Sequence, residues 1–440
     1  MNFKIYINYL REVLTLSFPM MMGNLGAMLI GAGSVLVAAK YSTDTLAAIS
    51  IANSVISCIV IFGIGMLAAV SPVLANRRGE KKSIKKYFVP TVEFSLVLAF
   101  FAMIVILLSI PCLEHVGFDP KIMPMIKQFM FISAFSTFGV FLQIALKEYL
   151  QAFEIVMFPN MLAFVSVFLN LILNFALVFG WGGLPALGVK GLAIADLIMR
   201  YFMGITMLVY CMVFINIHNY HENKYFVSLL KIGLPISFAI LLEFLAFNLG
   251  TIIMGHVAGV YAACQNILVT ITSITFMIPM AISNALSVKV GFANGAKNFT
   301  DLIRYSIVGI FASLLFMGFC SILLWSMPNL CIKIFSSDTS VLKICVPILI
   351  VIGFYQIFDG LQVSLGGIFK GLKKTKSIMV ADLVAYWVVG LPIGFILAFK
   401  YHMNLYGLWV GLAISIFTLS LFLLIFLFRA LKKINPNINN

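Results

Sequence analysis

Two carboxylic acids, Glu243 and Asp359, lie near the middle of long apolar segments of this 440-residue chain. A charge in the middle of a bilayer costs about 2.5–3.5 kcal/mol on insertion scales, so such residues usually face a cavity and act there. A surrounding of low dielectric favours the protonated acid, whereas a bound cation favours the carboxylate. Such an acid can therefore exchange a proton for a metal ion or a cationic substrate. The alternative is a protonated acid that only forms hydrogen bonds between helices.

Asp359 shares one side of its segment with two other polar residues. Tyr355, Asp359 and Gln362 follow an i, i+4, i+7 spacing, which places a phenol, a carboxylate and an amide on one helical face. Hard cations prefer several oxygen ligands, and this face can supply two or three. The pattern predicts that Tyr355 and Asp359, together with Glu243, couple a cation, and that Gln362 lines a cavity. A polar seam between two helices is the alternative.

A second polar stripe lies in the first half of the chain. Ser166, Asn170 and Asn174 repeat at i, i+4 and i+8. Asparagine in a membrane interior either joins helices by hydrogen bonds or lines a cavity, and both readings stay open. Asn170 and Asn174 are candidate cavity residues, as are Ser34 in the first apolar segment and Gln265 in the eighth.

Four further charged residues occur within or beside the apolar segments. Asp196 and Arg200 are four residues apart, and an internal ion pair that neutralises both is their simplest account. Glu93 and Asp382 are close enough to segment ends to reach headgroups or loop lysines. We rank these residues below Glu243 and Asp359.

The composition places the chain in a bilayer. Hydrophobic residues make up 62% of it, charged residues only 10%, and the mean hydropathy is +1.10; a soluble protein of this size cannot bury so much apolar surface. The first segment carries no A-x-A-like cleavage site and is too long for a signal-peptide core, so we expect it to be retained. Apolar windows long enough to span a membrane predict twelve helices, at roughly 14–39, 45–75, 88–110, 125–146, 156–180, 188–215, 232–256, 260–288, 305–327, 341–369, 377–399 and 405–428.

The chain repeats itself. Pro19 in L-T-L-S-F-P corresponds to Pro235 in L-K-I-G-L-P, 216 residues later, and G-L-A-I recurs after Gly191 and Gly411. Six helices followed by six helices give parallel repeats, whose substrate site lies between the halves near the midplane. The expected organisation is an N-lobe of helices 1–6, a cytoplasmic linker, and a C-lobe of helices 7–12 with a short tail, at residues 1–215, 216–231 and 232–440.

Basic residues set the expected orientation. A run of six Lys and Arg residues lies between the second and third segments, at Arg77, Arg78, Lys81, Lys82, Lys85 and Lys86. This run contributes much of an excess of Lys and Arg in the connections on one side of the membrane. By the positive-inside rule that side is cytoplasmic, and both termini lie there. A nucleic-acid patch is the alternative reading of the run, but a topological determinant accounts for it, so no nucleic-acid partner is expected. The net charge of +14 needs no further explanation.

Motifs of enzymes and metal proteins do not occur. The seven cysteines show no C-x-x-C or metal spacing, and the chain contains neither H-E-x-x-H nor G-x-S-x-G. We therefore expect no catalytic residue, no bound metal site and no cofactor, apart from a coupling ion.

Several longer motifs resemble one family. They are S-x-x-x-L-A-A-I-S-I-A-N-S from Ser42, L-L-E-F-L-A-F from Leu241, F-M-I-P-M-A-I from Phe276 and Y-x-x-x-D-G-L-Q-V from Tyr355. The G-x-x-K-G-L-K-K-T-K run from Gly367 adds to the match. Over nearly its whole length the chain resembles the multidrug and toxic compound extrusion (MATE) family, most closely its NorM branch.

The resemblance implies an all-α membrane protein whose two six-helix lobes form a V. It also implies an antiporter that exports organic, often cationic and amphipathic, compounds in exchange for Na+ or H+. Such a protein is expected to be a monomer surrounded by lipid, in a bacterial inner membrane, with small organic molecules as its substrates. By the same resemblance, Glu243, Tyr355 and Asp359 match the C-lobe cation site, and Asn170 with Asn174 match N-lobe residues near the cavity.

One position departs from the family. Many members carry an Asp in the first helix where this chain has Ser34, which favours the C-lobe acids and Na+. The alternative function is a flippase for lipid-linked or polysaccharide intermediates, of related architecture. That function calls for several cationic residues in the cavity, whereas the apolar windows here hold acids and a single basic residue, Arg200.

Overall fold

A computed structural model describes residues 3–115, 117–183, 185–215 and 223–434, and within these ranges all regular structure is helical. The first half contains α1 (Phe3–Tyr41), α2 (Thr43–Leu67), α3 (Val70–Gly79), η1 (Lys85–Tyr87), α4 (Phe88–Glu114), α5 (Met123–Ala152), α6 (Met157–Phe179), η2 (Trp181–Gly183) and α7 (Val189–Phe214). The second contains α8 (Asn223–Val257), α9 (Gly259–Gly295), α10 (Phe299–Ser326), α11 (Pro328–Lys333), α12 (Thr339–Gly371), α13 (Lys376–Asp382), η3 (Leu383–Gly390), α14 (Leu391–Phe395), η4 (Ile396–Lys400) and α15 (Asn404–Ile434).

In the part of the chain that the structure describes, twelve helical stretches are long and apolar enough to cross a membrane, which confirms the number expected from the sequence. The chain is thus a multi-pass integral membrane protein. Most stretches are longer than the apolar windows; for example, α5 and α9 extend to Ala152 and Gly295. Lys147 and Lys289 therefore lie within helices, just beyond the ends of the apolar windows expected from the sequence.

Local sequence explains several helix ends. The Ser42 hydroxyl caps α2 by accepting a hydrogen bond from the backbone N–H of Thr45 at 3.0 Å. The Asp338 carboxylate caps α12 by accepting a hydrogen bond from the backbone N–H of Ser340 at 2.8 Å. Gly180 ends α6 in the left-handed conformation, at φ 75°.

The eleventh span is irregular. Its path runs from α13 through the π-helical segments η3 and η4, with α14 between them. π-Helical turns are rare and often mark functional sites, because they shift side chains out of the regular helical register.

The chain forms two compact units. One consists of Met1–Phe18 and Phe238–Asn440, the other of Pro19–Ser237. The lobe boundaries expected from the sequence stay a prediction; the units differ from them because the beginning of α1 packs with the second half and the beginning of α8 with the first.

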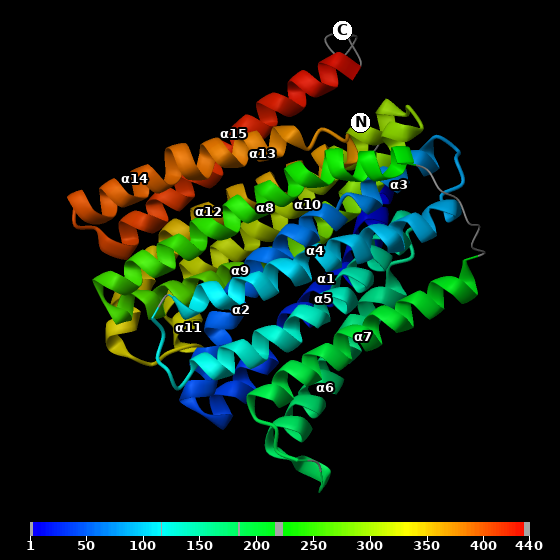
Figure 1. The fold of residues 1–440 in the computed structure, drawn as a ribbon. Helices are drawn as coiled ribbons and strands as arrows, with labels where there is room; N and C mark the ends of the chain where they lie inside the picture. Colours follow the sequence, from blue (N-terminus) through cyan, green and yellow to red (C-terminus); the bar gives the residue numbers. More distant parts are fainter. Residues whose placement is uncertain (1–2, 116, 184, 216–222, 435–440) are drawn as a thin grey trace. The chain divides into compact units, whose positions relative to one another are not determined.

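Each unit is a bundle of long helices (Figure 1). In the unit of Pro19–Ser237, α5 packs against α4 and α7; in the other, α12 packs against α9, α10 and α15. Gly139 permits the close approach of α5 to α7, since a Cβ atom there would lie 2.7 Å from the backbone carbon of Arg200.

Candidate ion-coupling site

Glu243 is held between two helical segments of the second half. The Tyr386 hydroxyl on η3 donates a hydrogen bond to Oε1 of Glu243 on α8 at 3.1 Å. The neighbouring Trp387 donates from Nε1 to the Leu242 carbonyl at 3.2 Å. These paired contacts fix the π-helical segment against α8 at the level of the carboxyl group.

Asp359 is almost completely buried on α12, with 1% of its surface exposed. Its Oδ1 accepts a hydrogen bond from Nε2 of Gln362, one turn further along, at 3.1 Å. Asp359 also interacts electrostatically with Glu243 and with the buried phenol of Tyr355. The structure therefore brings together the three residues that the sequence predicts to couple a cation, and places Gln362 beside them.

Asp382 belongs to the same cluster, although we ranked it lower from the sequence. It is 5% exposed, at the end of α13, and interacts electrostatically with Glu243 and Lys370. The sequence offered one sign that Asp382 belongs to this cluster: it lies four residues, or one helical turn, before Tyr386. Because Asp382 is buried, headgroups are not its partners, whereas its interaction with Lys370 at the end of α12 agrees with the expected lysine partner.

Four aromatic rings pack together beside Glu243. Phe247, one turn after Glu243, lies 6.3–6.4 Å from the ring centres of Tyr355, Tyr386 and Trp409. Trp409 donates from Nε1 to Oε1 of Gln265 at 2.8 Å. Gln265 is thus a fully buried partner of this aromatic cluster.

The first half contains its own acid. Oδ1 of Asp196 on α7 accepts hydrogen bonds from Ser34 on α1 at 3.2 Å and from Asn170 on α6 at 3.0 Å. Asn174 donates to the Ser34 hydroxyl at 3.2 Å and to Oδ1 of Asn170 at 2.8 Å. Arg200 interacts electrostatically with Asp196.

Ser34 occupies a position where many family members carry an Asp. The first half nevertheless has a carboxylate at this place, because Asp196 on α7 lies beside Ser34. The argument for Na+ that rested on Ser34 loses its force. Asn170 and Asn174 are 1% and 0% exposed and lie in a network between three helices. That arrangement favours helix joining over direct contact with a substrate.

The chemical capacity of the second-half cluster follows from its groups. Glu243, Asp359 and Asp382 can bind protons, and the carboxylates with the Tyr355 hydroxyl can supply oxygen ligands to a small cation. Within the described residues, no three His, Cys, Asp or Glu side chains are grouped so as to hold a metal ion.

Comparison with known families identifies the chain. The family model described as MatE matches residues 19–176 and 235–396, once in each half. The chain belongs to the MatE family. The two matched stretches also agree with the internal repeat.

Similar proteins include two described as probable multidrug resistance protein NorM. The one from Mesorhizobium japonicum is 28% identical over 427 residues, covering 92% of this chain and 90% of its own length. The one from Bacillus subtilis is 26% identical over 424 residues, covering 92% of each.

Solved structures of transporters share the fold. The eukaryotic MATE transporter AtDTX14 superposes with a TM-score of 0.87 at 19% identity, over 98% of this chain and 99% of its own. A MOP superfamily transporter from Pyrococcus furiosus gives 0.88 at 16% identity, over 97% and 96%. At these identities the likeness concerns the fold alone.

Proposed function

We propose that this MATE protein is a secondary active antiporter that exports organic, often cationic and amphipathic, compounds in exchange for Na+ or H+. In this proposal the protein is a transporter and not an enzyme. It acts as a monomer in a bacterial inner membrane with both termini in the cytoplasm, and needs no cofactor besides the ion. The names of its NorM relatives support multidrug export.

One observation carries the proposal of ion coupling. Glu243 and Asp359 interact electrostatically inside a unit of apolar helices, and each accepts a hydrogen bond from a buried neutral donor. When both are ionised, two interacting carboxylates in a low-dielectric surrounding repel each other. Binding of H+, Na+ or a cationic substrate therefore relieves the same repulsion, which makes ion and substrate competitors for one site.

Competition at one site gives exchange if the site faces the two sides of the membrane in turn. An ion entering from outside displaces the substrate, and a substrate entering from inside displaces the ion. Tyr355 contributes a neutral oxygen for a metal ion, and the aromatic rings around Phe247 suit the apolar part of an organic cation.

Efflux from proteoliposomes tests this function. The purified protein is reconstituted with a fluorescent organic cation inside, and an inward Na+ gradient or an inward pH gradient in Na+-free buffer is imposed separately. The proposal expects at least one gradient to accelerate efflux above the rate without a gradient. Equal rates under all three conditions would contradict antiport.

A further inference from the structure

The beginnings of α1 and α8 are exchanged between the two compact units. Residues 4–18, which we call the α1 arm, belong to the unit that contains α9 to α15, whereas residues 224–237, the α8 arm, belong to the unit that contains α2 to α7. Each of these helices therefore continues from one unit into the other.

The two arms are repeats of each other. Tyr225 follows Tyr9 by 216 residues, the separation that also relates Pro19 and Pro235. Tyr9 packs edge-on against Tyr305 with ring centres 4.7 Å apart, and Tyr225 packs against Tyr87 at 4.8 Å.

A guanidinium lies over each arm tyrosine. That of Arg304 is 5.6 Å from the ring centre of Tyr9, and that of Arg77 is 5.5 Å from the ring centre of Tyr225. The two attachments thus share a plan, although the strength of their other contacts differs.

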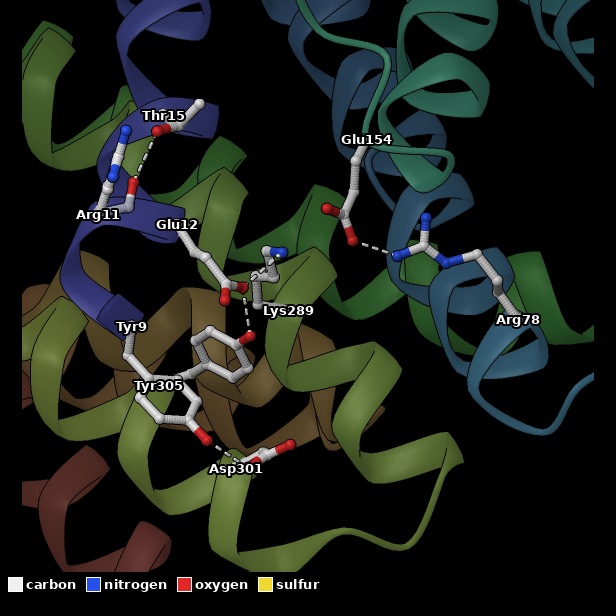
Figure 2. A network of polar contacts seen from close by, with 9 residues as sticks. All are labelled: Tyr9, Arg11, Glu12, Thr15, Arg78, Glu154, Lys289, Asp301 and Tyr305. Carbon is white, nitrogen blue, oxygen red and sulfur yellow. Dashed lines mark hydrogen bonds and ion pairs between the residues drawn. The ribbon is translucent and has the colours of Figure 1, made fainter. Parts of the chain in front are cut away.

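The α1 arm is attached mainly by polar contacts (Figure 2). Oε2 of Glu12 accepts hydrogen bonds from the Tyr305 hydroxyl at 2.6 Å and from Nζ of Lys289 at 3.0 Å. The Tyr9 hydroxyl donates to Oδ1 of Asp301. The Glu12 side chain is 48% exposed and that of Lys289 11% exposed, so solvent screens this ion pair from the side of Glu12.

The α8 arm is attached by buried packing. Tyr225 and Thr91 are both fully buried, with their hydroxyl oxygens 2.8 Å apart. The Ser237 hydroxyl donates to the Phe62 carbonyl at 2.7 Å. A Cβ atom at Gly233 would lie 2.8 Å from the Met66 carbonyl oxygen, so the two backbones are in direct contact.

Apolar burial widens the difference. Among the described residues of the α1 arm, the buried apolar side chains are Val13 and Leu16, whereas the α8 arm buries Tyr225, Leu229, Ile232, Pro235 and Ile236. The closer packing of these side chains holds the α8 arm more tightly than the α1 arm.

We propose that the α1 arm is a releasable latch and the α8 arm a permanent attachment. In the transport cycle the α1 arm separates from α9 and α10, which breaks the contacts of Glu12 and Tyr9, while the α8 arm stays against α2 and α4. The unequal attachment makes one of two equivalent arms the moving part, independently of which ion drives transport.

Cross-linking of the α1 arm tests release. In a variant without the seven native cysteines, Glu12→Cys and Lys289→Cys are joined by a short thiol-reactive cross-linker. Linking should lower efflux of a fluorescent cation by at least about tenfold, and reduction should restore it. Each single-cysteine variant treated with the same reagent should keep its rate. Efficient cross-linking with undiminished efflux would overturn the proposal.

Hydrogen exchange tests the same inference without a transport assay and without introduced cysteines. In the unsubstituted protein, backbone amides around Val13 should exchange at least about tenfold faster than those around Leu229. Glu12→Gln should accelerate exchange in the α1 arm and leave the α8 arm unchanged. Equal protection of both arms, or faster exchange in the α8 arm, would contradict the proposal whatever the variants do in the efflux assay.

Discussion

The phenol of Tyr386 donates a hydrogen bond to the carboxyl group of Glu243 across 3.1 Å, and so joins η3 to α8. The two residues are 143 positions apart in the sequence, and the segment that carries Tyr386 is π-helical. The hydrogen bond holds the carboxyl group of Glu243 in place at Oε1.

Removal of this hydrogen bond should weaken ion coupling. In Tyr386→Phe the ring contact with Phe247 is retained, but the carboxyl group loses a donor worth about 1.5–3 kcal/mol when charged. We expect the concentration of coupling ion at half-maximal efflux to change by about tenfold or more. Tyr401→Phe, at a position that is 63% exposed, is the control and should have no effect. An unchanged ion dependence in Tyr386→Phe would show that the phenol does not position Glu243.

The Tyr355 hydroxyl should distinguish the two coupling ions. Na+ needs neutral oxygen ligands in addition to carboxylates, whereas a proton needs only the acid. If Na+ is the coupling ion, Tyr355→Phe should raise the Na+ concentration at half-maximal efflux. If H+ is the ion, efflux driven by a pH gradient should be unchanged by the substitution. A loss of efflux under both gradients would instead assign Tyr355 to substrate binding.

The sequence could predict contacts within one helix. The spacing of Asp359 and Gln362 indicated a shared face, and these side chains are hydrogen-bonded. It could not predict which distant segment meets Glu243, because Tyr386 is 143 residues away and lies in a π-helical turn that the regular helical period does not describe. Asp382 was ranked low for the same reason, since its burial depends on how α13 packs.

Apolar periodicity also predicted the twelve spans but not the exchange of the arms. The helical pattern continues through Pro19 and Pro235, so the sequence does not show where each helix passes from one unit to the other. The contact between Ser34 and Asp196 was likewise invisible, because 162 residues separate them.

Stability should depend on close backbone contact at Gly139. Gly139→Ala adds a Cβ atom 2.7 Å from the backbone of Arg200, so α5 and α7 must separate. We expect a loss of about 1–3 kcal/mol, measured as a lower melting temperature in detergent. Gly366→Ala is the matched control on α12, where no atom lies within 4 Å of the added Cβ. It should be neutral or stabilising by up to about 1 kcal/mol. Similar effects of both changes would contradict the packing argument.

The Asp196 network should require an oxygen acceptor. Asp196→Leu leaves the donors of Ser34 and Asn170 without their partner and should destabilise the protein by about 1–3 kcal/mol. Asp196→Asn keeps a carbonyl oxygen and should retain most of the stability. Thermal unfolding of the two variants makes the comparison, and equal destabilisation would show that the charge of Asp196, rather than its acceptor oxygen, holds the network.

Efflux by Glu243→Gln and Asp359→Asn tests the central claim most directly. Both variants and a control, Asp44→Asn at an exposed position, are reconstituted and measured with an imposed Na+ or pH gradient. Because each amide keeps the shape of the acid but cannot exchange a proton for a cation, the account predicts folded, monodisperse variants without gradient-driven efflux, and an unaffected control. Efflux at the unsubstituted rate by either variant under the driving gradient would contradict the coupling role of that carboxylate.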